Sequence, residues 1–70
     1  MQSALTLTLN GEARRLDAPV TVAGLLAKLG LDRRKVAVER NEAIVPRSLY
    51  DETGLAEGDL LEIVHFIGGG

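Results

Sequence analysis

The chain has 70 residues, of which 46% are hydrophobic and 26% are charged, and its formal net charge is −2. This length fits one small domain without room for a pocket that encloses a substrate and a catalytic shell, and the mild acidity argues against a nucleic-acid or membrane-surface partner. The absence of cysteine excludes disulfides and thiolate chemistry, and no apolar stretch reaches the roughly 18 residues of a membrane helix, so we expect a cytoplasmic protein.

A β-hairpin is the first predicted element. Leucine alternates with threonine over residues 5–9, a period of two that predicts a half-buried strand. Asn10-Gly11 follows at once and is the preferred dipeptide of a tight type I′ turn, so residues 13–16 are expected to return antiparallel. Because the N-terminal stretch has no basic region, we interpret it as this strand and not as a signal peptide.

A helix is predicted next, because the apolar residues change to helical spacing. The residues that share its apolar stripe are Val22, Leu25, Leu26 and Leu29. Thr21 is a suitable N-cap, and Gly30 stands where a left-handed residue commonly ends a helix. Gly24 costs about 1 kcal/mol relative to alanine inside a helix, and we attribute it to close packing of the helix on the sheet.

Three more strands are predicted after the helix. Residues 36–45 form a second hairpin with its turn at Asn41-Glu42, and Pro46 ends the return strand because proline cannot donate to a ladder. Turn-forming residues with at most one short helical turn come next. The last strand is expected over residues 60–67.

This order of elements predicts an α+β fold. One helix of about nine residues has to cover one face of a mixed sheet of four to five strands, because no other element can bury the leucines. A right-handed crossover then places the later strands beside the first hairpin. This is the β-grasp (ubiquitin-like) arrangement, which serves unrelated functions. We expect a β-grasp domain over residues 1–67 and a flexible glycine tail over residues 68–70.

The side chains offer few candidates for catalysis. His65 is the only histidine, no cysteine can pair with it, and zinc requires three or four protein ligands. We interpret His65 as a strand residue near a rim, and the acidic residues between 51 and 59 as capping or solvated groups. The basic residues between 28 and 40 are interrupted by acidic ones, which favours a solvated face. We therefore predict no catalytic residue, no metal site and no enzyme.

The C-terminus is the unusual feature of the sequence. Gly68, Gly69 and Gly70 follow directly on the predicted last strand, and three glycines reach about 10 Å through a channel too narrow for side chains. A partner that uses ATP and Mg²⁺ can convert the terminal carboxylate into an acyl-adenylate, which a sulfur or amine nucleophile can attack. Without cysteine, any sulfur that the chain carries has to sit on the carbonyl of Gly70. The alternative is a frayed terminus.

A docking surface is predicted beside this tail. The period of two puts Glu62, Val64 and Phe66 on one side of the last strand. Because Glu62 should face water, Val64 and Phe66 are expected to be exposed apolar groups that partner enzymes bind. The alternative is that Phe66 packs on the end of the sheet or against a loop.

Three segments carry a resemblance to a known family: VAVERNEAIVPRS, EGD and EIVHFIGGG. Together with the first hairpin and the helix they resemble the ThiS family, small β-grasp sulfur carriers of thiamine (thiazole) biosynthesis. The resemblance implies that an E1-like (ThiF-like) adenylyltransferase adenylates Gly70, which becomes a thiocarboxylate, while Gly68 and Gly69 thread the partner active sites. It also implies a sulfur donor such as a cysteine desulfurase and a ThiG-like thiazole synthase as acceptor.

One departure from the family pattern and several alternative functions accompany this resemblance. The second hairpin of the family often carries Asn-Gly, whereas a type I′ turn at Asn41-Glu42 would force glutamate to positive φ, so we expect a different turn or a wider loop. The fold and tail also fit the small subunit of molybdopterin synthase or a tRNA-thiolation carrier. A non-covalent ubiquitin-like interaction module with an incidental tail is an alternative of another class.

Overall fold

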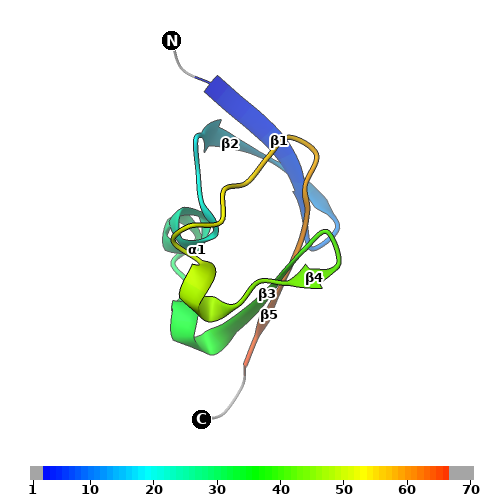
Figure 1. Ribbon diagram of the computed structural model, residues 1–70. Coiled ribbons are helices and arrows are strands. Elements are labelled where there is room, and N and C mark those ends of the chain that lie inside the picture. The colour runs from blue at the N-terminus through cyan, green and yellow to red at the C-terminus, as the bar shows by residue number, and fades with distance from the viewer. Residues whose placement is uncertain (1–2, 67–70) are drawn as a thin grey trace.

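The computed structural model describes residues 3–66, so the predictions for residue 67 and for the glycine tail fall outside the described residues. Its strands and α-helix are β1 (Ser3–Leu9), β2 (Glu12–Ala18), α1 (Val22–Leu29), β3 (Val36–Arg40), β4 (Ala43–Ile44) and β5 (Leu60–His65). Two short 3-10 helices are η1 (Arg33–Lys35) and η2 (Arg47–Leu49). Figure 1 shows α1 lying inside the curve of the sheet.

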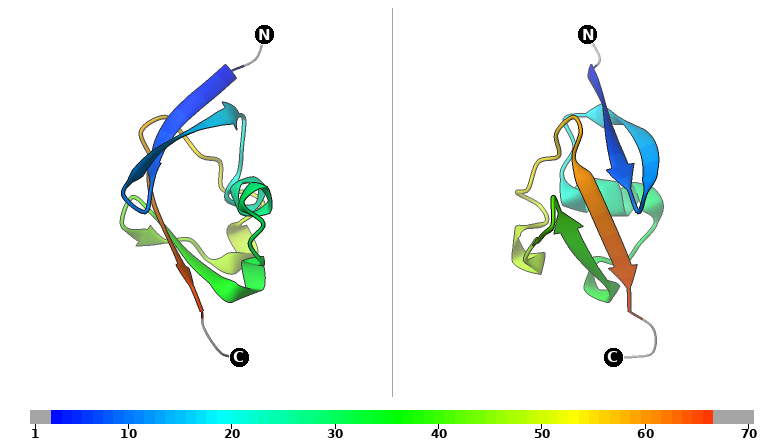
Figure 2. Two further views of the ribbon diagram at one scale, coloured as in Figure 1. Left: turned by 180° about the vertical axis from the view of Figure 1, so that it is seen from behind. Right: turned by 90° about the vertical axis from the view of Figure 1, so that its right-hand side faces the viewer.

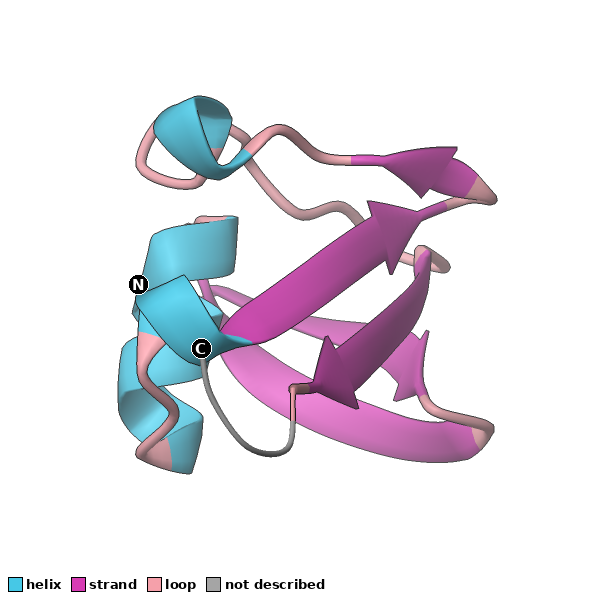
Figure 3. Ribbon diagram, turned by 90° about the horizontal axis from the view of Figure 1, so that it is seen from below, coloured by secondary structure: helices cyan, strands magenta, loops and turns pink. Residues whose placement is uncertain are grey.

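The five strands form one mixed sheet in the order β2-β1-β5-β3-β4. The middle strand, β5, runs parallel to β1 and antiparallel to β3. The sheet curls around α1 in the left view of Figure 2, and Figure 3 shows the helical segments gathered on one side of the strands. The predicted α+β fold of the β-grasp type is confirmed.

Some strand ends differ from the prediction. β2 extends beyond residues 13–16 at both ends because it pairs with β1 along the full length of β1. β4 has two residues instead of three, although the Val45 N–H still donates to the Val38 carbonyl at 2.9 Å. β5 ends at His65, and the next backbone N–H, that of Phe66, donates to the Lys35 carbonyl at 2.8 Å.

Both predicted caps of α1 are confirmed. The Thr21 hydroxyl accepts a hydrogen bond from the Gly24 N–H at 3.1 Å, and Gly30 adopts the left-handed conformation with φ 72°. The packing explanation for Gly24 is wrong, because this glycine is exposed and a Cβ there would meet Val20 Cγ2 at 3.3 Å, in the segment before the helix, and not the sheet. In the described part of the chain, no helix is long and apolar enough to cross a membrane.

The hydrophobic core lies between α1 and the face of the sheet that α1 covers, which we call the inner face. The buried apolar residues are Leu5, Leu7, Leu9, Val22, Leu25, Leu26, Val36, Val38, Val45, Tyr50, Leu55 and Leu61. The predicted alternation of β1 is confirmed, since its leucines are buried. The ring of Tyr50 is buried beneath the Arg33 guanidinium, which lies 5.5 Å from the ring centre, and its hydroxyl donates to the Val36 carbonyl at 3.3 Å.

The turn of the second hairpin contradicts the expectation of a wider loop. Arg40 pairs with Ala43, so the loop has two residues, and Asn41 and Glu42 have φ values of 53° and 70°. Asn41 explains how this conformation is held. Its backbone N–H donates to the Leu60 carbonyl at 2.7 Å, and its side-chain oxygen accepts from the Leu60 N–H at 2.9 Å. These bonds to β5 offset the cost of about 1 kcal/mol that a left-handed glutamate carries.

Candidate functional site

The outer face of the sheet, which is turned away from α1, carries the predicted docking residues. Along β5, Leu61 is buried, whereas Glu62, Val64 and the following Phe66 are exposed. Val64 is 58% exposed and Phe66 is 50% exposed. The prediction that two apolar groups are exposed at this end of β5 is confirmed. Their role in docking stays a prediction.

The exposed apolar area is larger than the sequence indicated. Leu60 and Ile44, at 54% and 65% exposure, belong to it as well. Strand pairing places Glu39 between Ile44 on β4 and Glu62 on β5. We call these residues the outer patch: Glu39, Ile44, Leu60, Glu62, Val64 and Phe66. Sequence reasoning missed Leu60, and it missed Glu39 and Ile44 because neighbours across strands depend on the register of the sheet.

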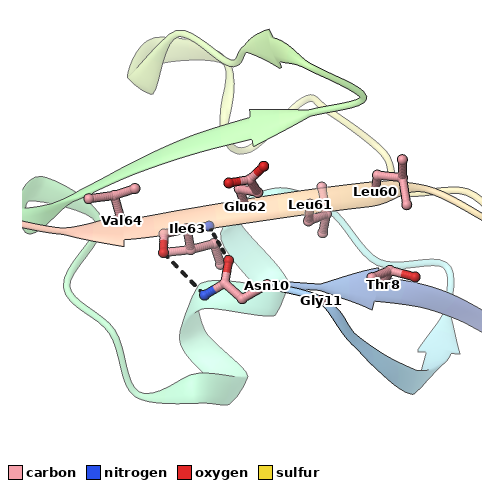
Figure 4. A pocket seen from close by; sticks show the side chains of 8 residues that line it. All are labelled: Thr8, Asn10, Gly11, Leu60, Leu61, Glu62, Ile63 and Val64. Atoms are coloured by element: carbon pink, nitrogen blue, oxygen red, sulfur yellow. Dashed lines mark hydrogen bonds between the residues drawn. The ribbon is translucent and has the colours of Figure 1, made fainter.

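A groove of about 590 Å³ runs along β5 beside the outer patch (Figure 4). Its lining residues are Thr8, Asn10, Gly11, Leu60, Leu61, Glu62, Ile63 and Val64. The pairing of β1 with β5 covers only Thr8 with Leu60 and Leu9 with Leu61. Beyond that point the side chain of Asn10 replaces backbone pairing, because its oxygen accepts from the Ile63 N–H at 2.8 Å and its amide donates to the Ile63 carbonyl at 3.2 Å.

A buried carboxylate, that of Asp59, anchors the start of β5. It accepts hydrogen bonds from Arg40 Nε at 2.8 Å, from the Ala56 N–H at 2.8 Å and from the Asn41 amide at 3.1 Å. Burial raises the pKa of Asp59, but these hydrogen bonds outweigh it and hold the pKa below 3.8. The predicted capping role of Asp59 is confirmed by the bond from Ala56. The prediction that Arg40 belongs to a solvated face is wrong, because Arg40 turns inward to this pair.

Two basic residues of η1, Arg33 and Arg34, form ion pairs at the surface. Arg33 lies 3.0 Å from Asp51, and Arg34 lies 2.9 Å from Asp32. The side-chain hydrogen bond from Arg34 is the main cause that lowers the pKa of Asp32 to about 2. These pairs agree with the predicted solvated face. Among residues 3–66, no three His, Cys, Asp or Glu side chains lie close enough to hold a metal ion.

The predicted reactive terminus lies outside the described residues. The assignments of Gly70 as the modified residue, and of Gly68 and Gly69 as the residues that thread partner sites, therefore stay predictions. In the sequence these glycines follow two residues after Phe66, the last residue that the structure describes. His65 is exposed at this rim, as predicted.

Comparison with known proteins shows which family matches this chain. The model of the ThiS family matches residues 7–70. The chain is 56% identical over 66 residues to a thiazole synthase from Paramagnetospirillum magneticum. The aligned region covers 94% of this chain and 20% of the relative. It is 46% identical over 50 residues to the sulfur carrier protein ThiS of Bacillus subtilis. This aligned region covers 71% of this chain and 76% of the relative.

A solved structure agrees with these matches. The crystal structure of a thiamine biosynthesis protein (ThiS) from Geobacter metallireducens superposes with a TM-score of 0.79 at 33% identity, covering 94% of this chain and 100% of the other. The chain spans only 20% of the length of the thiazole synthases from Paramagnetospirillum magneticum and Magnetococcus marinus. The family model, by contrast, matches almost the entire chain. The chain therefore belongs to the ThiS family.

Proposed function

We propose that this chain is a sulfur carrier of thiamine biosynthesis, a protein co-substrate on which partner enzymes act. The observation that carries the proposal is the match to the ThiS family, which continues through the last glycine, Gly70. The name of the Bacillus subtilis relative, a sulfur carrier protein, supports the same function. The thiazole synthases that contain a similar region support a thiazole synthase as the acceptor of the sulfur.

The α-carboxylate of Gly70 is the reactive group in this proposal. An E1-like (ThiF-like) adenylyltransferase transfers AMP from ATP to the carboxylate and releases pyrophosphate, with Mg²⁺ held in the site of that enzyme. The terminal sulfur of a persulfide, supplied by a donor such as a cysteine desulfurase, then attacks the activated carbonyl and expels AMP together with one carboxylate oxygen. A second thiol of the partner proteins cleaves the S–S bond of the resulting acyl disulfide, forms a disulfide with the donor sulfur and so supplies the two electrons that the step needs. The product is a thiocarboxylate on Gly70, and its sulfur passes to the thiazole ring on a ThiG-like thiazole synthase.

In this proposal, the glycines enter the active site of the partner and the outer patch binds the surface of the partner. Gly68 and Gly69 lack side chains, which suits passage through a narrow channel toward a buried active site. Val64 and Phe66 are exposed at the end of β5 that precedes these glycines, and Glu62 lies next to them. An exposed apolar area beside the reactive end supports docking of the folded domain at the channel mouth.

Intact-protein mass spectrometry tests this function. The chain is incubated with ATP, Mg²⁺, the adenylyltransferase and a sulfur source, and the expected product has gained the mass difference between sulfur and oxygen at Gly70. Two control chains, one that lacks Gly70 and one with a single residue added after it, should stay unmodified. An unmodified natural chain, or sulfur located elsewhere, would contradict the proposal. A non-covalent module would keep its partner without Gly70.

A further inference from the structure

Two carboxylates lie side by side at the centre of the outer patch. Glu39 and Glu62 pair directly across β3 and β5, a geometry that separates their Cβ atoms by about 4.5–5.5 Å. Among residues 3–66, no ion pair includes either glutamate. The nearest cation in the sequence, Arg40, is bound to Asp59 on the inner side. Like charges placed directly opposite destabilise a sheet, so folding does not explain this pair.

Apolar side chains surround the two carboxylates. Ile44 lies opposite Glu39 on the neighbouring strand, and Leu60 and Val64 flank Glu62 two residues away on either side. All three apolar side chains are more than half exposed. A partner that buries these apolar groups therefore also has to cover the carboxylates that lie between them.

We infer that the partner surface on the outer patch presents an arginine, flanked by apolar side chains, whose guanidinium binds Glu39 and Glu62 together. Covering two unpaired carboxylates with an apolar surface is strongly unfavourable, so the partner has to supply a cation. A guanidinium carries several N–H donors in one plane and can bind two carboxylates at once, which a lysine ammonium does less well.

The thiazole synthase is the partner to which we assign this arginine, and the assignment rests on the proposed function. Thiazole synthases themselves contain a region up to 56% identical to this chain, so in those proteins the carrier-like region and the synthase belong to one polypeptide. The outer patch also leads directly into the reactive terminus, since Phe66 is its last member. Docking through the outer patch therefore brings the terminus to the acceptor.

Calorimetric titration of the thiazole synthase from the same organism tests the inference. The variants Glu39→Gln and Glu62→Gln keep side-chain size but remove one charge each, and each is expected to weaken binding about tenfold and to reduce its dependence on salt. Because both carboxylates share one guanidinium, the double variant should lose less affinity than the two single losses multiplied together. Circular dichroism checks that each variant is folded.

A matched control removes two charges outside the outer patch. The double variant Glu12→Gln and Glu52→Gln changes exposed positions and should bind like the natural chain. If the double glutamine variant at positions 39 and 62 also binds like the natural chain, the inference is overturned while the carrier function stands. If the natural chain acquires sulfur at Gly70 but does not bind the synthase, the acceptor assignment falls together with the inference.

Discussion

The inner and outer faces of the sheet follow different rules. On the inner face, Leu7 and Val38 are almost fully buried against the rest of the core, and burial of apolar surface is the main force that stabilises a small domain. On the outer face, Val64 remains exposed beside two like charges, Glu39 and Glu62. Folding explains the first set of residues and opposes the second. Binding is therefore the role that we propose for these residues of the outer face.

The largest expected effect comes from the inner face. Leu7→Ala should lower the free energy of unfolding by about 2–5 kcal/mol, because it leaves a cavity in the core. The matched change on the outer face, Val64→Ala, should alter it by less than about 0.5 kcal/mol. Urea denaturation measures both. Similar losses for the two variants would break the comparison between the faces.

A second prediction concerns the ion pair between Arg40 and Asp59. The charges of this pair should stabilise the fold, whereas the charges on the outer face should not. Asp59→Asn should cost about 1–3 kcal/mol, because Arg40 then stays partly buried without its counter-charge. The pKa of Asp59 in the folded state lies below 3.8. Its stabilisation is therefore complete above about pH 4 and is lost as the pH falls through the folded-state value.

Urea denaturation at a series of pH values measures this effect. As the pH falls below about 4, the stability of the natural chain should decrease more steeply than that of Asp59→Asn. Parallel pH curves for the two proteins would show that this ion pair contributes no more than exposed charges do.

Phe66→Asp should separate binding from folding. We expect it to weaken binding to the adenylyltransferase about tenfold, equivalent to about 1.4 kcal/mol, because an apolar contact is replaced by a charge. Stability should change by less than about 1 kcal/mol, because the side chain is half exposed. Leu49→Asp is the control, since Leu49 is an exposed apolar residue in η2, outside the outer patch. Equal binding by the natural chain and Phe66→Asp in a titration would remove Phe66 from the docking surface.

The smallest expected effect has the opposite sign. Glu39→Lys should raise the free energy of unfolding by about 0.2–1 kcal/mol, because it replaces a like-charge pair with Glu62 by an opposite-charge pair. The same variant should lose affinity for the thiazole synthase. Thermal unfolding and titration measure the two effects. A variant with unchanged or lower stability would show that the two carboxylates do not strain the outer face.

Local sequence signals predicted most of the fold because local interactions determine those elements. The Asn10-Gly11 turn has two residues with positive φ. The Thr21 and Gly30 caps form hydrogen bonds with backbone groups of the helix that they flank. The exposure of Val64 also follows from a local rule, the alternation of side chains along one strand. Such features need no knowledge of which strands are neighbours.

The features that the sequence did not predict depend on contacts between distant segments. Local preference argued against a tight turn at Glu42, but the bonds of Asn41 to Leu60, nineteen residues away, hold it in place. The proximity of Glu39 and Glu62 likewise exists only once β3 and β5 are in register. An isolated reading of either strand shows one solvated glutamate.

The central position of β5 has a mechanical consequence for the proposed function, in which partner enzymes act on the C-terminus. Tension applied at the C-terminal side of β5 acts along the strand. Its hydrogen bonds to β3 and β1, and those of Asn10 to Ile63, then resist together in shear and do not open one after another. Under the proposed function, a partner enzyme that binds the terminus applies such tension, and the domain is expected to stay folded through repeated cycles.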